Sequence, residues 1–212
     1  KKFSFPFYFM DFEYVDQGVP IVKNSKPYIK LPFQWSVHKW ESENSEIDRG
    51  NYFLKFSDHN IERKFIEQLL EAVGNSGTIF AHNANSAEVK ILESLKEKDS
   101  CKDLVGRIDK LIDRVEDSLI LARMNFYSPL MNGDWGIKSI IKAIPNCPIN
   151  YEEKDNIAGG DDAQVAWFIY TNPKTDSKKR EKLEKFLIDY CSKDTLAVYY
   201  LVKYLMEGSK NN

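Results

Sequence analysis

The chain has few cysteines, and their spacing suits neither a disulfide framework nor a zinc cluster. Cys101, Cys147 and Cys191 are odd in number, lie far apart and form no CxxC pair. Disulfide-stabilised domains carry dense, paired cysteines, and structural zinc sites use closely spaced pairs. We therefore interpret all three as ordinary reduced thiols.

Long apolar runs are also missing. No stretch reaches the roughly 18 apolar residues that a membrane-spanning helix requires. The first residues place Pro6 in an aromatic run, where a signal peptide would have its apolar core. The sequence therefore predicts a soluble, cytoplasmic protein that does not associate with a membrane.

The chain has no strong excess of either charge. Thirty basic and thirty-two acidic residues give a net charge of −2, which does not by itself indicate nucleic-acid binding. It does not exclude such binding, because a site that holds phosphates through metal ions is itself acidic and needs only a local basic rim. We interpret the basic run at 178–185 as a solvated helix face.

The chain has enough hydrophobic residues to form one core. The 212 residues are 42% hydrophobic, and we predict a single domain over residues 1–207 with a polar tail at 208–212. Residue 1 is Lys, and an apolar strand begins almost at once. We therefore expect a domain cut from a longer protein, whose other domains are candidate partners.

Apolar periodicity indicates the order of the elements. Apolar and aromatic runs predict strands at 7–14, 33–40, 52–56 and 78–81. Helical spacing predicts a helix at 61–73, with an N-cap at Ser57-Asp58, and a helix that carries Glu88. It also predicts helices at 102–114, 135–144 and 163–170 and a last helix from about 178 to about 206. Strands followed by βα units and terminal helices predict an α/β fold.

Two acidic residues interrupt the first strand. Asp11 and Glu13 lie two residues apart among Phe and Tyr residues, so both carboxylates point to the same side of a strand. Burying like charges side by side is costly unless a cation neutralises them. The sequence therefore predicts a metal site, and oxygen ligands favour Mg²⁺ or Mn²⁺. The alternative is an edge strand whose acids face solvent.

Three further residues fit such a site. Glu88 begins a predicted helix, and Tyr190 precedes Asp194 by one helical turn, so these two share a helix face. Each has a simpler interpretation: Glu88 as an acid that complements the helix dipole, and Tyr190 with Asp194 as a core aromatic beside an exposed acid. Their joint order favours the metal site.

The ordered motifs resemble a known family. They are Asp11-x-Glu13, His82-Asn83-Ala-Asn-Ser-Ala-Glu88-x-x-x-Leu92, Asp117-Ser-Leu-x-Leu-Ala-Arg123 and Tyr190-Cys-Ser-Lys-Asp194-Thr195. Together they resemble the DEDD superfamily of 3′→5′ exonucleases, and the tyrosine in the last motif resembles the tyrosine subclass. The resemblance implies a ribonuclease-H-like fold, a mixed central sheet flanked by helices.

Two further segments narrow the resemblance. Residues 126–139 and 190–197 look like an uncharacterised bacterial branch of this superfamily, in which the domain commonly ends a longer protein. One position departs from the superfamily pattern, since Glu88 stands where Asp is usual and Asn83 lies one residue out of step with the usual Asn. Asp117 is the competing ligand, but the resemblance implies a structural role for it.

The resemblance also implies roles for the site residues. Asp11 would bind both of two Mg²⁺ or Mn²⁺ ions, Glu13 would bind one, Asp194 would complete the site, and Glu88 would ligate a metal or hold its water. Tyr190 would orient the attacking water, because a phenol with an ordinary pKa of about 10 is a poor base at neutral pH. These five are the predicted catalytic residues.

Five residues are predicted to contact substrate, namely Phe12, His82, Asn83, Trp135 and Lys138. Three of them have plain alternatives: a loop histidine that hydrogen-bonds backbone for His82, a core aromatic for Trp135, and a solvated lysine for Lys138. The expected substrate is DNA or RNA with a single-stranded 3′ end. The sequence thus predicts a metal-dependent 3′→5′ exonuclease, with an endonuclease of the same fold or an inactive nucleic-acid-binding domain as alternatives.

Overall fold

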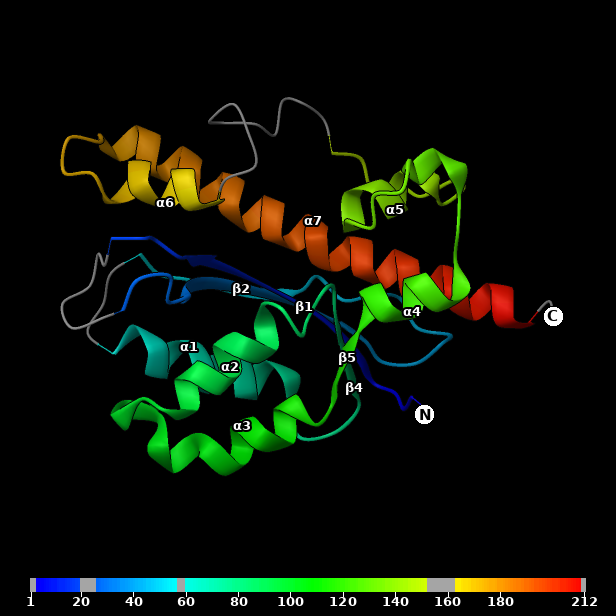
Figure 1. The fold of residues 1–212 in the computed structure, drawn as a ribbon, viewed down its shortest axis with the longest axis horizontal. Coiled ribbons are helices and arrows are strands. Elements are labelled where there is room, and N and C mark those ends of the chain that lie inside the picture. Colours follow the sequence, from blue (N-terminus) through cyan, green and yellow to red (C-terminus); the bar gives the residue numbers. More distant parts are fainter. Residues whose placement is uncertain (1–2, 20–25, 57–59, 152–162, 211–212) are drawn as a thin grey trace.

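A long, strongly apolar strand forms the centre of the molecule. In the computed structural model, which describes residues 3–19, 26–56, 60–151 and 163–210, β1 (Phe7–Val15) lies in the middle of a five-stranded sheet. Helices cover both faces of this sheet (Figure 1). The predicted α/β class is confirmed, and the mixed sheet is compatible with a ribonuclease-H-like fold.

The sheet combines an antiparallel half with a parallel half. Its order is β3-β2-β1-β4-β5, built from β2 (Leu31–Trp40), β3 (Asn51–Leu54), β4 (Thr78–Ala81) and β5 (Val115–Asp117) as well as β1. β1, β2 and β3 pair antiparallel, whereas β4 runs parallel to both β1 and β5. The carboxyl ends of β1, β4 and β5 therefore point toward the same edge of the sheet.

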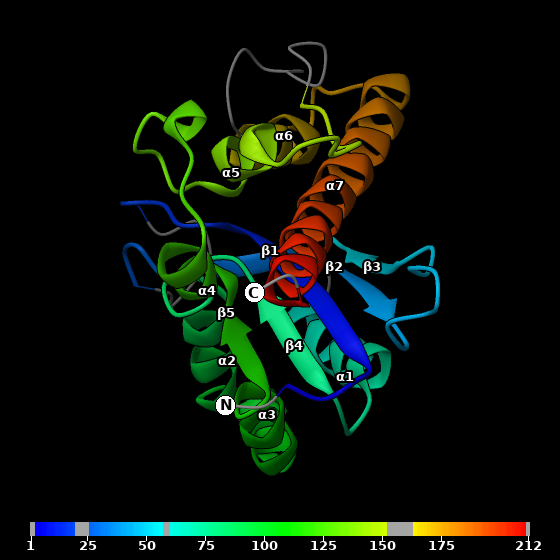
Figure 2. The same cartoon turned by 90° about the vertical axis from the view of Figure 1, so that its right-hand side faces the viewer.

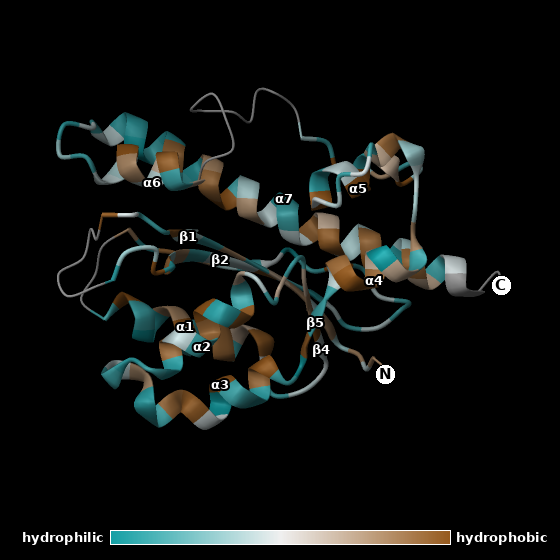
Figure 3. Cartoon of the chain, in the orientation of Figure 1, coloured by the Kyte–Doolittle hydropathy of each residue, from teal (hydrophilic) through white to brown (hydrophobic). Residues whose placement is uncertain are grey.

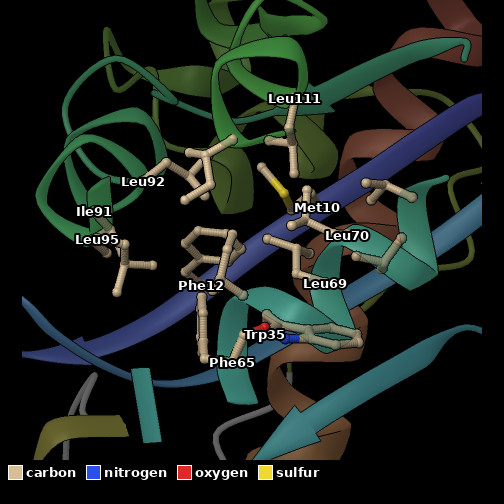
Figure 4. Packing of buried hydrophobic residues seen from close by; sticks show 14 of the residues in the cluster. Met10, Phe12, Trp35, Phe65, Leu69, Leu70, Ile91, Leu92, Leu95 and Leu111 are labelled. Carbon is tan, nitrogen blue, oxygen red and sulfur yellow. Dashed lines mark hydrogen bonds between the residues drawn. The ribbon is translucent and has the colours of Figure 1, made fainter. Parts of the chain in front are cut away.

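Three helices cover one face of the sheet. They are α1 (Ile61–Val73), α2 (Glu88–Lys96) and α3 (Val105–Ile112), with a short 3₁₀ turn η1 (Asp99–Leu104) before α3. The even-numbered β1 residues Tyr8, Met10 and Phe12 join the core beneath them. Figure 4 shows Phe12 among side chains from α1 and α2, and its ring meets that of Phe65 edge-on at 5.0 Å.

The opposite face is crossed by the C-terminal helix α7 (Ser177–Lys210), which packs on β1 and β2 (Figure 2). α4 (Ser118–Asn125), the turn η2 (Pro129–Met131), α5 (Ile137–Ala143) and α6 (Ala163–Thr171) surround it. Its buried residues include Leu183, Leu187, Cys191, Thr195, Val198 and Val202, a spacing of three or four that makes one helix face. Hydrophobic and hydrophilic residues accordingly alternate along the helices in Figure 3.

A buried polar seam joins β2 to α7. Gln34, Ser36 and His38 alternate along β2, so they share one face, and all three are buried. Gln34 Nε2 donates to Leu187 O at 2.6 Å, while Thr195 Oγ1 lies 3.2 Å from Ser36 Oγ and 2.8 Å from His38 Nδ1. Since a buried polar group without a partner costs about 1–3 kcal/mol, this seam favours one register of α7 on the sheet.

The predicted elements differ from the observed ones mainly at their ends. β5 was not predicted, because three residues are too few for an alternating pattern. The helix predicted at 102–114 is divided into η1 and α3. α7 continues to Lys210, which is into the predicted polar tail. The expected cap at Ser57-Asp58 lies outside the described residues.

Among the helices that the structure describes, none combines the length and apolar character needed to cross a membrane.

Arg114 ties α1 to the start of the parallel half of the sheet. It donates from Nε to Gly77 O at 2.8 Å, from Nη1 to Gly74 O at 2.6 Å, and from Nη2 to Val73 O at 2.8 Å and to Ser76 O. Carbonyls at the end of a helix have no partner within the helix. The guanidinium therefore satisfies the end of α1 and the turn into β4 together.

We expect Arg114→Ala to lower the free energy of unfolding by about 2–4 kcal/mol, because several part-buried carbonyls lose charged donors. Arg114→Lys should restore only part of the loss, since an ammonium lacks the planar fork. Urea denaturation provides the measurement. Arg107→Ala, at an exposed position of α3, is the control and should change stability by less than about 0.5 kcal/mol. Equal effects of the two alanine variants would contradict this role.

Candidate functional site

Asp11 and Glu13 are held on the α7 face of β1. Strand alternation sends the odd-numbered residues of β1 to this face, where Phe7 and Phe9 pack in the core near α7. The pairing with β2 sets Asp11 opposite Ser36 and Glu13 opposite Gln34. Both acids keep part of their surface open to solvent. The prediction that the two side chains share one face of the strand is thus confirmed.

Glu88 begins α2 and is only 2% exposed. Burial raises the pKa of its carboxyl to about 8, although hydrogen bonds from the backbone amides of Glu88 itself and Phe12 act to lower it. Among the described residues its Oε2 atom is one of few buried side-chain atoms with no hydrogen-bond partner. Such an atom is suited to accept a ligand.

Asp194 comes to the site from α7. Its Oδ1 accepts a hydrogen bond of 2.6 Å from the Tyr151 hydroxyl. Burial raises the pKa of Asp194 to about 6, whereas the Tyr151 hydrogen bond and the charges of Lys138 and Lys193 lower it.

The pKa of Asp11 is raised by burial and by the charges of other acids. Its pKa is raised well above the ordinary value, first by desolvation and then by the charges of Asp194, Glu13 and Glu88. Carboxylates from three elements, Glu13 of β1, Glu88 of α2 and Asp194 of α7, therefore all act on Asp11. Mutual repulsion in a desolvated site is relieved either by protonation or by a bound cation.

A lysine and two tyrosines adjoin Asp194. Lys138 Nζ donates to the Tyr190 hydroxyl at 2.9 Å and lies 4.9 Å from the centre of the Tyr190 ring and 5.3 Å from that of the Tyr151 ring. Tyr190 also precedes Asp194 by one turn of α7. The ammonium thus stands beside the acids, within the site that the sequence predicted for Tyr190 and Lys138.

Two residues that the sequence did not assign to the site also lie in it. Cys191 Sγ is 3.4 Å from Asp11 Oδ2, and its sulfur and one oxygen each of Asp11 and Glu13 lie within 4.8 Å of one another. Helical spacing to Asp194 could have indicated Cys191. Tyr151 lies in an irregular segment and carries no such signal.

His82 fastens the loop before α2 to the segment before α5. Its ring nitrogens lie 3.0 Å from Ser118 Oγ and 2.9 Å from Trp135 O. Desolvation lowers the pKa of His82, which favours the neutral imidazole. This geometry corresponds to the alternative of a loop histidine bonded to backbone. The Trp135 ring packs partly buried against the α5 core and has Arg123 5.9 Å from its centre.

Asp117 organises the same loop. Its Oδ1 accepts from the amides of Asn83 and Leu119 at 2.9 and 3.0 Å, and its Oδ2 accepts from the amide and side chain of Asn85, both at 3.3 Å. It therefore caps α4 and fixes the loop that leads to Glu88. These bonds agree with the structural role expected for Asp117, and the Asn83 side chain remains exposed.

Phe12 is not brought to the acids. Its side chain is 4% exposed and lies in the core beneath α1 and α2, on the other face of β1. Alternation along the strand requires this, because Phe12 lies between Asp11 and Glu13. The prediction that the Phe12 side chain contacts substrate is therefore wrong. The side chain packs in the core, and the backbone amide of Phe12 donates a hydrogen bond to the Glu88 carboxylate.

The raised pKa values make the metal-free protein sensitive to pH. Asp11, Glu88 and Asp194 each bind a proton more tightly in the folded state. The folded state therefore holds more protons than the unfolded state between the two pKa values of each group, and stability falls as pH rises. For Glu88 this interval runs from 4.5 to about 8. In EDTA we expect the thermal midpoint to fall from about pH 5 to about pH 8, and Mn²⁺ to raise it more at the higher pH.

Glu88→Gln should flatten this pH dependence and raise the midpoint at about pH 8 in EDTA, because the amide carries no charge to desolvate. Glu97→Gln, at the exposed end of the same helix, is the matched control and should leave the slope unchanged. Thermal melts followed by circular dichroism provide the measurement. Identical slopes in the two variants would show that Glu88 does not carry the effect.

Comparison with curated proteins and with solved structures found no match. The family model described as "Domain of unknown function (DUF2779)" matches residues 8–136. This match covers more than half of the 212 residues and includes Asp11, Glu13 and Glu88, while Tyr190 and Asp194 lie beyond it. By this match the chain belongs to the family described as Domain of unknown function (DUF2779).

Proposed function

We propose that this protein is a metal-dependent nuclease that hydrolyses phosphodiester bonds, acting as a 3′→5′ exonuclease on DNA or RNA. One observation carries the proposal, namely that Glu13, Glu88 and Asp194, from three separate elements, all act on the desolvated carboxyl of Asp11. The ordered motifs that resemble the DEDD superfamily supply the same four acids.

The residues fit divalent cations. The four carboxylates offer oxygen ligands, which Mg²⁺ and Mn²⁺ prefer, and Glu88 Oε2 is buried without a hydrogen-bond partner in the described part of the chain. Asp11, Glu13, Glu88 and Asp194 would hold the cations. When bound, such cations would neutralise the scissile phosphate and supply a nucleophilic water and a stabilised leaving oxygen.

Tyr190 and Lys138 would complete the chemistry. The Tyr190 hydroxyl, one turn before Asp194, would orient the attacking water through a hydrogen bond. Lys138 donates to this hydroxyl at 2.9 Å and thereby sets its direction. The same ammonium would stabilise negative charge that develops on the phosphate, as preorganised donors do. Tyr151 holds Asp194 in place through its 2.6 Å hydrogen bond.

Several exposed groups could receive a nucleic-acid strand. Asn83 is exposed on the loop before α2, and Tyr127 is 73% exposed just after α4. An exposed aromatic ring stacks on unpaired bases without regard to their sequence, which suits a single-stranded 3′ end. Trp135 is partly buried and offers less of its ring for stacking than Tyr127.

The first test is cleavage of 5′-labelled single-stranded DNA and RNA in Mg²⁺, Mn²⁺ or EDTA. We expect a metal-dependent ladder that shortens from the 3′ end, and Asp11→Asn or Asp194→Asn should reduce its rate by about a thousandfold or more. Asp113→Asn removes an exposed acid before β5 and should cleave as the wild type does.

The pattern of products distinguishes the alternatives. Discrete internal cuts, unaffected by a blocked 3′ end, would move the assignment to an endonuclease of the same fold. Retained binding of the oligonucleotide without cleavage in any metal, by a folded wild-type protein, would indicate an inactive nucleic-acid-binding domain and overturn the proposal.

Lys138 offers a second test. Lys138→Met removes the ammonium and keeps much of the aliphatic chain, so we expect kcat to fall by about 10²–10³-fold with little change in Mn²⁺ affinity. Lys142→Met lies one turn further along α5 at an exposed position and is the control. Single-turnover kinetics and Mn²⁺ titration measure the two quantities. A wild-type rate in Lys138→Met would exclude a role for the ammonium.

A further inference from the structure

The thiol of Cys191 lies beside the carboxylates of Asp11 and Glu13. Cys191 is fully buried on α7, and its sulfur is 3.4 Å from Asp11 Oδ2 and 3.6 Å from the Asp11 carbonyl oxygen. The sulfur belongs to the same group, within 4.8 Å, as the carboxylates of Asp11 and Glu13. A thiol serves no purpose in binding Mg²⁺, which takes oxygen ligands.

The separation of these atoms matches a shared metal ion. Zinc bonds of about 2.3 Å to sulfur and about 2.1 Å to oxygen, at a tetrahedral angle, place the two ligand atoms about 3.6 Å apart. In the structure the Cys191 thiol donates a hydrogen bond to Asp11 Oδ2, with the sulfur 3.4 Å from the oxygen. The pair therefore needs little movement to bind one cation.

A second observation points to a ligand near Asp11. Glu88 is 2% exposed, its Oε2 has no hydrogen-bond partner among the described residues, and its charge is one of three that act on Asp11. A buried carboxylate oxygen that is not satisfied by protein groups has room for a cation or its bound water. Carboxylates together with one sulfur form a mixed set of hard and soft donors.

We propose that Asp11, Glu13 and Cys191 form a binding site for a thiophilic divalent cation such as Zn²⁺ or Cd²⁺, overlapping the Mg²⁺ or Mn²⁺ site. On binding, the S–H bond breaks, the sulfur electron pair forms the bond to the cation, and the proton passes to solvent. Thiophilic cations therefore displace Mn²⁺ and inhibit the nuclease. This inference rests on the proposed function, because both kinds of cation use Asp11 and Glu13.

The test is a Cd²⁺ titration followed by the ultraviolet charge-transfer absorption of a cadmium–thiolate bond. The variant Cys101→Ala/Cys147→Ala leaves Cys191 as the sole thiol and should retain the band of the wild type. Cys191→Ser should lose it, and Asp11→Asn should weaken Cd²⁺ binding although the thiol is intact. If the single-thiol variant shows no band, or if the band persists in Cys191→Ser, the inference is wrong.

Mn²⁺ binding, read by electron paramagnetic resonance, separates this inference from the proposed function. Wild type should bind Mn²⁺, and Cd²⁺ should release it, whereas Cys191→Ser should bind Mn²⁺ with less than about a tenfold change in affinity because oxygen ligands dominate. Mn²⁺ binding without a cadmium–thiolate band would overturn only the Cys191 site. Absence of Mn²⁺ binding in folded wild type would overturn the metal centre itself, and with it the proposed function.

Discussion

Repulsion between Asp11 and three other carboxylates is the constraint on which the candidate site depends. Glu13, Glu88 and Asp194 all act on Asp11, and burial raises the pKa of Glu88 and of Asp194 as well. A fold that brings such groups together has a lower free energy of unfolding unless protons or cations neutralise them. The apolar packing on both faces of the sheet, from α1 to α3 and from α7, offsets this cost and holds the acids in place.

The position of α7 depends on the polar seam with β2. Gln34 bonds the helix backbone at Leu187, and Ser36 and His38 meet Thr195, one residue after Asp194. Apolar surfaces alone would tolerate a shift along the helix, because hydrophobic contacts are not directional. Directed hydrogen bonds set the register, and the register aims Cys191 and Asp194 at β1.

Directed hydrogen bonds also set the position of the loop before α2. Asp117 gathers the amides of this loop, and His82 fastens it to Trp135. These bonds place the first residue of α2, which is Glu88. Residues that resemble parts of a nuclease motif thus support the centre without touching it. The groups beside the acids are Tyr190, Lys138, Tyr151 and Cys191. The site therefore combines carboxylates with two phenols, the ammonium of a lysine and a thiol.

The sequence by itself determined most of the elements and the acid pair. Alternation in β1 requires Asp11 and Glu13 to share a face, and periodicity identifies β4 and most of α7, because these patterns are local. The same alternation sends Phe12 into the core, which the substrate prediction overlooked.

The tertiary structure alone decided which distant groups meet. Cys191 contacts Asp11 across 180 residues of chain, and Tyr151 reaches Asp194 from an irregular segment. The short strand β5 likewise takes its place from pairing with β4. No local pattern encodes such contacts, since they follow from the docking of α7 on the sheet.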